Sequence, residues 1–433
     1  MRQAVDPPTG PALWRQRNFR TYWAGGAVSE VGDRVSELAI PLIAITVLHV
    51  SPTMVGLLTA AIWAPNLLSV FIGAWVDQQP SKRRLLVAAN LLQGLTIASL
   101  PVAHLLGGVS LVQLFAVAVV NGFAGVVCGT ANATFFAHLV PRSRYVEANS
   151  LISSTRSLSF VAGPAAGGAL IQAVTAPVAM VVDSVSFLVA AAALGRLRVE
   201  ERASAERAPG GMLRQAAGGL RLLRRHPYLR PALCCVTTLN FFSFVVQAII
   251  VLYASRTLGL SPGAIGLALA LGAVGGFLGA VTAGRAARRF GTGITIAIGA
   301  VAFAAPFAAL PLAVGASHAG KIAVLAGVEF VSAAAVMWFD VNLNALQTAV
   351  IPDGMRSRVA GAFSTVNYGI RPLGAVIGGV SAQVFGIAPT VVVAAVGGSL
   401  AVLWLLGTPI LATRTLGDLA DEPQLEAPAR RSA

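Results

Sequence analysis

The stretch Gly73-Ala74-Trp75-Val76-Asp77 has a counterpart about 211 residues later, in Gly284-Arg285-Ala286-Ala287-Arg288. Gly167-Gly168 has a counterpart in Gly378-Gly379 at the same offset. Each copy contains roughly six apolar stretches. A long internal repeat of apolar segments is typical of membrane proteins built from two parallel halves, with the working site between them. The repeat therefore predicts two six-helix halves.

The composition also indicates a membrane protein. Of the 433 residues, 56% are hydrophobic and 11% are charged, whereas soluble domains carry about 25% charged residues. The apolar residues form runs of about 20, long enough for a helix to cross a bilayer, and helices satisfy their own backbone hydrogen bonds in lipid. We therefore expect an all-α integral membrane protein with twelve transmembrane helices in two pseudo-symmetric six-helix bundles. The expected spans are 23–48, 54–76, 84–106, 110–137, 148–173, 177–195, 232–254, 263–283, 293–315, 320–349, 358–384 and 389–411.

The formal net charge of +14 is distributed unevenly along the chain. Lys and Arg gather in alternate loops, while the other loops hold little beyond Arg256 and Lys321. This distribution follows the positive-inside rule and places both termini in the cytoplasm. It also argues against nucleic acid as a partner, and the basic loops are expected to meet anionic lipid head groups.

The alternation of apolar and basic segments suggests the domain boundaries. We expect a cytoplasmic N-terminal segment over 1–22, six-helix bundles over 23–195 and 232–412, a basic cytoplasmic linker over 196–231 and a cytoplasmic tail over 413–433. Apolar residues from Leu213 to Leu223 recur at helical spacing, which fits an amphipathic helix on the membrane surface. A solvated tether with some helix fits the linker equally well.

Charged residues inside the expected spans are the strongest indication of function, because such charges usually face a partner or a water cavity. Glu30, Asp33, Arg34 and Glu37 lie on one stripe of the first helix. Glu30 can reach Arg34, while Asp33 and Glu37 stack as like charges. One of two close carboxylates in a low dielectric should hold a proton near neutral pH. The stripe is therefore a proton-coupling site or a structural ion network that closes a gate.

Five further charged residues lie in later spans. Asp183, Glu329 and Asp340 are additional candidates for proton coupling. Arg156 and Arg371 occupy comparable places in the two halves, ahead of a Gly-Gly pair. Each can pair with an acid across its bundle, and arginine also binds anionic substrates bidentately. We favour structural pairing for Arg156 and leave both roles open for Arg371.

The fifth span contains Gly163-Pro164-Ala165-Ala166-Gly167-Gly168. Small residues at four-residue spacing allow two helices to approach closely, and Pro164 removes a backbone donor and bends the helix. A tight helix crossing is therefore expected here.

These motifs resemble the major facilitator superfamily over nearly the whole chain. Gly73 to Asp77, followed by Lys82-Arg83-Arg84, resembles the family's loop 2–3 signature, and the stretch from Gly284 to Gly291 resembles its second-half echo. The span-five motif at Gly163, Pro164, Gly167 and Gly168 resembles that of the drug:proton antiporter branch. Weaker likenesses to the macrolide and enterobactin exporter subgroup are Asn18-Phe19-Arg20, Gly32-Asp33 and Asp183-Ser184-Val185-Ser186-Phe187.

The resemblance implies the family's fold, a bacterial plasma (inner) membrane, and a cytoplasmic gate. In that gate Gly73 would allow close packing and Asp77 would pair across the two halves in the outward-open state. The supporting residues would be Lys82, Arg83 and Arg84, with Gly284, Arg288 and Arg289 in the second half. Gln78 stands where a basic residue is expected, and Arg288 stands where an acid would be. The gate pairing is therefore weaker than in the family at large, or carried differently.

The family arrangement would also make spans one, four, seven and ten line a central cavity. Apolar walls with a few polar groups suit amphiphilic ligands. Phe241, Phe242 and Phe244 add aromatic surface, although such a run more often packs between helices or faces lipid. The candidates for the cavity are Asn121, Asn132, Arg156, Asn240, Gln247, Trp338, Asn342, Asn344 and Arg371.

The sequence therefore predicts a secondary active transporter that exports an amphiphilic small molecule by alternating access and proton antiport. An antibiotic, a siderophore or another secondary metabolite fits as substrate. Uptake or lipid movement by the same scaffold is an alternative, and a non-transporting membrane receptor is a weaker one. We expect no enzyme activity, no metal and no cofactor, with the transmembrane proton gradient as the energy source. Membrane lipid and protons are the other expected partners, and we expect a monomer.

Overall fold

The computed structural model describes residues 12–199, 201, 221, 223–224, 226–351 and 355–419, without the side chains of 356–358 and 418–419. Most of the expected amphipathic helix in the linker lies outside these described residues. The same holds for the start of the N-terminal segment and the end of the C-terminal tail. Where the chain is described, its regular elements are all helical, which confirms the expected all-α fold.

The first half contains six helical segments. In chain order they are α1 (Arg17–Leu42) continued by η2 (Ile43–Val47); α2 (Pro52–Trp63), η3 (Ala64–Leu68) and α3 (Ser69–Gln78) as one segment; α4 (Lys82–Leu106); α5 (Leu111–Leu139); α6 (Tyr145–Val174), preceded by η4 (Arg142–Arg144); and α7 (Ala176–Arg196).

The second half repeats this plan. Its segments are α9 (Leu229–Leu252) continued by η5 (Tyr253–Thr257); α10 (Pro262–Phe290); α11 (Thr292–Ala304) continued by η6 (Ala305–Ala313); α12 (His318–Val350); α13 (Arg356–Gly369) followed by α14 (Arg371–Phe385); and α15 (Ile387–Ser399) continued by η8 (Leu400–Leu405). The short elements η1 (Leu13–Arg15), α16 (Pro409–Ala412) and η9 (Leu416–Leu419) flank the two halves.

Ten of these segments are long and apolar enough to cross a membrane, counted over the described residues. The first segment is not among them because it carries the charged stripe. The eleventh is not among them because it is divided after Gly369, and Pro372 in the first turn of α14 cannot donate a backbone hydrogen bond. Each expected span falls on one segment, but α10 extends seven residues beyond the expected end at 283, and the twelfth segment ends at Leu405, before the expected 411.

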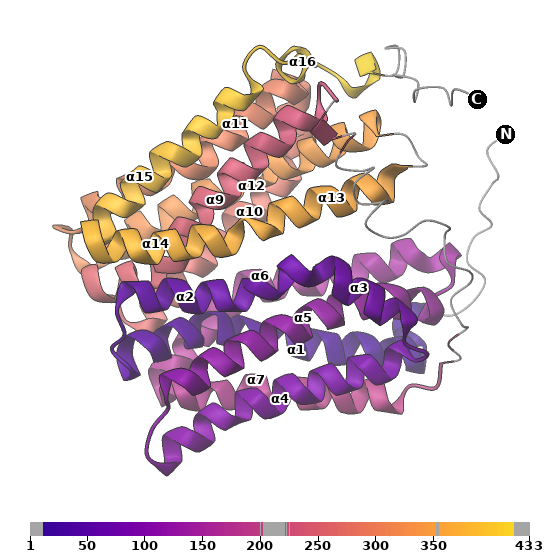
Figure 1. Ribbon diagram of the computed structural model, residues 1–433, viewed down its shortest axis with the longest axis vertical. Coiled ribbons are helices and arrows are strands. Elements are labelled where there is room, and N and C mark those ends of the chain that lie inside the picture. Colours follow the sequence, from indigo (N-terminus) through magenta and orange to yellow (C-terminus); the bar gives the residue numbers. More distant parts are fainter. Residues whose placement is uncertain are drawn as a thin grey trace.

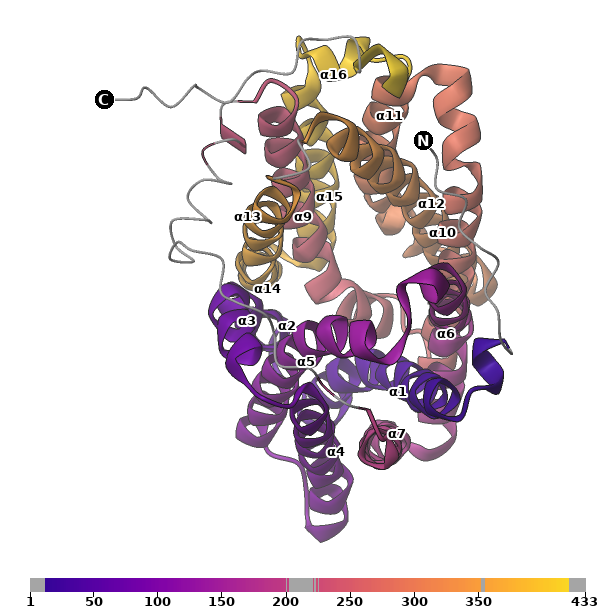
Figure 2. The same ribbon diagram turned by 90° about the vertical axis from the view of Figure 1, so that its right-hand side faces the viewer.

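The two halves form two bundles that lie one against the other (Figure 1). The turned view in Figure 2 shows α1 to α7 in one bundle and α9 to α15 in the other. We call the end that holds Lys82, Arg144, Arg196 and Arg288 the basic end. The other, which holds Ser51, Gln172 and Arg256, is called the opposite end.

Two glycine crossings join the bundles. Gly168 of α6 meets Gly266 of α10, and a Cβ added to Gly168 would lie 2.9 Å from the Gly266 Cα. Gly56 of α2 meets Gly379 of α14 in the same way, since a Cβ on Gly379 would lie 2.9 Å from the Gly56 Cα. Only glycine allows the backbones to approach this closely. The repeated Gly-Gly pairs of the sequence therefore lie at equivalent crossings between the halves.

Candidate functional site

The charged stripe of α1 forms an ion network with α6. Glu30 accepts a hydrogen bond from Arg156 Nε at 3.1 Å and lies 3.8 Å from Arg34 Nη2. Arg34 Nη1 in turn lies 2.7 Å from Glu37 Oε2. Arg34 thus bridges two acids of its own helix, and Arg156 joins the network from α6. The pairing expected for Arg156 is seen, although two thirds of its side chain is exposed.

Asp183 of α7 is buried beside this network. It is fully buried and accepts hydrogen bonds from Ser36 of α1 and, at 3.3 Å, from Ser186 of its own helix. Gly32 makes this possible, because a Cβ there would collide with Asp183 Oδ1 and Ser186 Oγ. The Gly32-Asp33 pair and the Asp183–Phe187 stretch, distant in sequence, therefore form one contact between α1 and α7.

Asp33 differs from the other acids of the cluster. It lies within electrostatic reach of Asp183, Glu30, Glu37 and Arg34, yet it has no hydrogen bond or ion pair to any residue that the structure describes. Among the described residues, the cluster contains four carboxylates and two guanidinium groups. The carboxylates are those of Glu30, Asp33, Glu37 and Asp183, and the guanidinium groups are those of Arg34 and Arg156. Both guanidinium groups pair with Glu30 or Glu37. Asp33 is therefore the acid of α1 that has no paired cation among the residues that the structure describes.

The span-five motif positions this cluster. A Cβ on Gly163 would collide with the side-chain stem of Arg34, and one on Gly167 would lie 3.2 Å from the Val35 Cα. The ring of Phe160 lies 5.4 Å from the Arg34 guanidinium carbon. The α6 motif thus has two faces, one that packs on α1 and one, at Gly168, that crosses to the second half.

Arg371 lies in a second unusual environment, at the break between α13 and α14. Its guanidinium carbon lies 4.6 Å from the Trp63 ring centroid, 4.8 Å from that of Phe244 and 4.2 Å from that of Tyr368. Trp63 comes from α2 in the first half, so both halves contribute. Trp63 stacks on Tyr368 with ring planes 8° apart, and its ring meets Phe244 edge-on at 5.1 Å. We call these three rings the aromatic box.

Two cations of the loop signature, Lys82 and Arg83, hold helix ends. Lys82 is buried, and its Nζ donates to the carbonyls of Val76, Asp77 and Gln79 at 2.7–3.0 Å, which caps the end of α3. Arg83 donates to the carbonyls of Gly195 and Leu197 at the end of α7.

Glu201 caps the start of α4, the helix that carries Lys82 and Arg83. Its carboxylate accepts hydrogen bonds from Ser81 Oγ at 2.8 Å and from the backbone amides of Lys82 and Arg83. An acid at a helix N-terminus satisfies free amides and complements the helix dipole. The loop is thereby fixed within the first half.

The remaining gate candidates are exposed, except for the half-buried Gly73. The Asp77 side chain faces outward at the basic end, and a Cβ on Gly73 would make only an ordinary 3.8 Å contact with Thr130. Gly284, Arg288 and Arg289 of the second half are exposed as well, and so is Arg84 of the first half. In this conformation, the structure does not bring Asp77 together with a cation of the part of the second half that it describes.

The polar cavity candidates are held mainly by local hydrogen bonds. Asn121, Asn240 and Asn342 each donate to a carbonyl one turn earlier, while Asn132 accepts from Tyr22. Trp338 donates to Thr282 of α10 at 2.9 Å, and Gln247 and Asn344 are exposed. Glu329 packs against Gly272 of α10, and Asp340 lies within electrostatic reach of Arg371.

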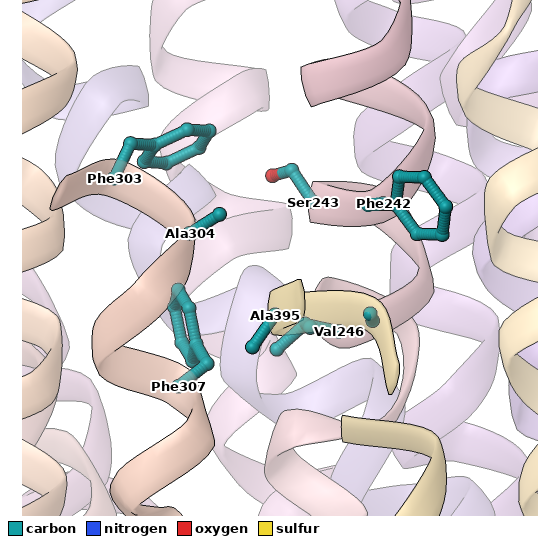
Figure 3. Close-up of a pocket in the computed structure, with 8 residues that line it drawn as sticks. Phe242, Ser243, Val246, Phe303, Ala304, Phe307 and Ala395 are labelled. Carbon is teal, nitrogen blue, oxygen red and sulfur yellow. The ribbon is translucent and has the colours of Figure 1, made fainter. Parts of the chain in front are cut away.

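A small apolar cavity lies inside the second half rather than between the halves. Phe242, Ser243, Phe303 and Phe307 line it together with residues of α15, and the Ser243 hydroxyl points into it (Figure 3). It offers about 10 Å³ to the centres of water molecules, which suffices for about one water. Phe242 and Phe244 accordingly pack between helices, as is more usual for a run of phenylalanines.

Several of these residues were not expected from the sequence. Trp63 and Tyr368 carry no motif, and only their encounter with Arg371 in space distinguishes them. Gln172 and Arg256 join the halves at the opposite end, where Gln172 Oε1 accepts from Ser261 Oγ and the Gly263 amide at 3.0 Å each. Arg256 donates to the carbonyls of Ile45 and Val50 at 3.3 and 3.0 Å. The isolated position of Arg256 in an otherwise uncharged loop was the one available signal.

Comparison with known proteins identifies the family. Residues 9–428 match the family described as transmembrane secretion effector, MFS_3. The multidrug efflux pump Tap of Mycolicibacterium fortuitum is 25% identical over 342 residues, covering 75% of this chain and 80% of Tap.

Solved structures show the same fold. A bacterial homologue of the iron transporter ferroportin in its inward-facing state gives a TM-score of 0.69 at 17% identity, covering 90% of this chain and 99% of that one. Its outward-facing state gives 0.56 at 18% identity, with the same coverage.

Proposed function

Since the chain belongs to the transmembrane secretion effectors of the major facilitator superfamily, it is a membrane transporter rather than an enzyme, and we propose that it exports an amphiphilic small molecule by proton antiport. The similarity to a multidrug efflux pump supports the direction of transport. A central cavity with apolar walls and few polar groups, as expected from the sequence, would suit an amphiphilic substrate. The expected orientation in a bacterial inner membrane, with the basic end in the cytoplasm, remains part of this proposal.

The conformation fits one step of alternating access. The hydrogen bonds of Gln172 and Arg256 and both glycine crossings join the halves at the opposite end. The better superposition on an inward-facing structure than on the outward-facing state of the same protein agrees with this. We assign the structure to a state that is closed on the extracellular side and receives its substrate from the cytoplasm.

The position of Asp33 is the observation on which proton coupling rests. Glu30 and Glu37 are paired with arginines, and Asp183 is held by two serines. Asp33 shares their surroundings without a cation of its own. We therefore assign the exchanged proton to Asp33, which has Asp183 of α7 as a neighbouring acid.

Transport in proteoliposomes tests this assignment. An efflux substrate is first identified by susceptibility tests in an efflux-deficient host. Asp33→Asn should then abolish uptake of that substrate driven by a pH gradient, because an amide cannot take up and release a proton. Exchange of labelled for unlabelled substrate, which needs no net proton movement, should continue.

Glu147→Gln serves as the matched control. Glu147 is also an acid of the first half, but it pairs with Arg144 at 2.9 Å away from the cluster. This variant should keep gradient-driven transport. If Asp33→Asn retained it too, Asp33 would not be the coupling site, and if the wild-type protein ignored the gradient, proton antiport would be wrong.

A further inference from the structure

Arg371 is an intramembrane cation whose charge is left unneutralised. Its Nε is buried and has no hydrogen-bond acceptor, and no acid forms an ion pair with it among the residues that the structure describes. Asp340 is near enough to influence it electrostatically but not to pair with it. A buried guanidinium N–H without an acceptor costs free energy, so this arrangement leaves a place for an acceptor.

The aromatic box stabilises the positive charge of Arg371 without forming an ion pair with it. Aromatic rings attract a guanidinium through their faces, and the three ring centroids lie 4.2–4.8 Å from its carbon. These contacts form no ion pair, and among the described residues the Nε–H group has no hydrogen-bond acceptor. The charge and this N–H group are therefore left for a ligand, and the rings offer an apolar surface beside them.

The location of Arg371 suits a substrate rather than a structural ion pair. It begins α14 at the point where span eleven is interrupted, and Pro372 follows it. Interrupted helices at mid-membrane are where many transporters bind their substrates. The box also combines Trp63 of the first half with Tyr368 and Phe244 of the second. A ligand bound here contacts both rocking halves.

We propose that Arg371 and the aromatic box form a binding site for the carboxylate of an amphiphilic organic anion that has an aromatic or apolar body. The guanidinium binds the carboxylate bidentately, and the body lies against the rings. This site rests on the proposed transport function and specifies the class of its substrate.

Binding of two matched probes to the full-length protein in phosphatidylcholine nanodiscs tests the site. The probes are 2-naphthoate and its neutral isostere 2-naphthamide, measured by isothermal titration calorimetry against empty nanodiscs. The wild type should bind naphthoate about tenfold or more tightly than naphthamide, the effect of one charge-assisted contact. Arg371→Gln should remove this preference and leave naphthamide binding unchanged.

Two variants complete the test. Arg142→Gln removes the same charge from an exposed position of η4 and should keep the preference for naphthoate. Arg371→Lys, which keeps the charge, should weaken naphthoate binding severalfold because an ammonium lacks the planar fork. It remains informative if Arg371→Gln does not fold.

Equal affinity of the wild type for the two probes, absence of naphthoate binding, or a preference that survives in Arg371→Gln would overturn the proposal. These measurements involve no pH gradient. A failure of proton antiport in proteoliposomes would therefore leave the binding result intact, and a failure here would leave antiport intact.

Discussion

At the scale of single residues, Gly32 determines how α1 and α7 meet. The absence of a side chain at this position lets Asp183 and Ser186 lie against the backbone of α1. Ser36, one turn further along, then reaches the Asp183 carboxylate. A buried carboxylate is tolerated when hydrogen bonds satisfy it, so the glycine and the two serines act together.

We expect Gly32→Ala to destabilise the protein by about 1–3 kcal/mol, the usual cost of overpacking. The new methyl group would displace the Asp183 carboxylate from its serine donors. Thermal unfolding in detergent should show a lower midpoint than for the wild type. Gly26→Ala, on the same helix with nothing within 4 Å of the added Cβ, should leave the midpoint unchanged or raise it. Equal midpoints for the two variants would contradict this account.

The sequence predicted part of this arrangement. Helical spacing alone placed Glu30, Asp33, Arg34 and Glu37 on one stripe, and the structure has the expected contact of Glu30 with Arg34. The proximity of Asp183 could not be predicted, because it depends on how α7 packs on α1. The same holds for Trp63 and Tyr368 around Arg371, since contacts between helices far apart in sequence leave no local pattern.

At the scale of helices, the cations of the loop signature have unequal roles. Lys82 donates to three carbonyls at the end of α3, a position where positive charge is also favoured by the helix dipole. Arg84 is exposed, and its side chain has no hydrogen bond or ion pair to a residue that the structure describes; its backbone amide donates to Ser81 Oγ at 3.3 Å. Neighbours in one basic cluster therefore contribute differently to the fold.

We expect Lys82→Ala to loosen the end of α3, because three carbonyls lose their shared donor. The cost should be about 1–3 kcal/mol. Hydrogen exchange followed by mass spectrometry should show faster exchange in the peptide that covers the end of α3. Arg84→Ala, which removes the adjacent cation, should leave that peptide unchanged. Comparable acceleration in both variants would show that the basic cluster acts only through its overall charge.

Helix boundaries were predictable wherever hydropathy alone determines them. The interruption at Gly369 was not, since the residues on both sides are apolar enough to read as one span. Its cause is local, because Pro372 lacks the amide that a continuous helix would need. The cap that Glu201 provides to α4 was not predictable either, because that residue lies in the linker, more than a hundred positions from Ser81.

At the scale of the whole molecule, the sequence repeat corresponds to two equivalent helix crossings between the halves. Gly168 with Gly266, and Gly56 with Gly379, place the halves in backbone contact near the opposite end. The sequence indicated the repeat of Gly167-Gly168 in Gly378-Gly379 but not their partners. The charged cluster, by contrast, belongs to the first half, and the box around Arg371 is centred in the second. The scaffold is thus doubled while its chemistry is divided between the halves.

We expect Gly56→Val to shift the protein away from the conformation seen here. A Cβ at this position would lie 2.8 Å from the Gly379 Cα, and backbone atoms cannot turn aside as a side chain can. Leu105 and Leu312 lie at the opposite end, one in each half, and are 79% and 77% exposed. Spin labels at these two positions, in a background without native cysteines, should report a longer distance between them than in the wild type. Gly129→Val, where a Cβ meets nothing within 4 Å, should keep the wild-type distribution. Substrate exchange should slow only in Gly56→Val, because in the proposed alternating-access cycle the crossing closes once in every turn. An unchanged distance distribution in Gly56→Val would mean that the crossing does not hold this state together.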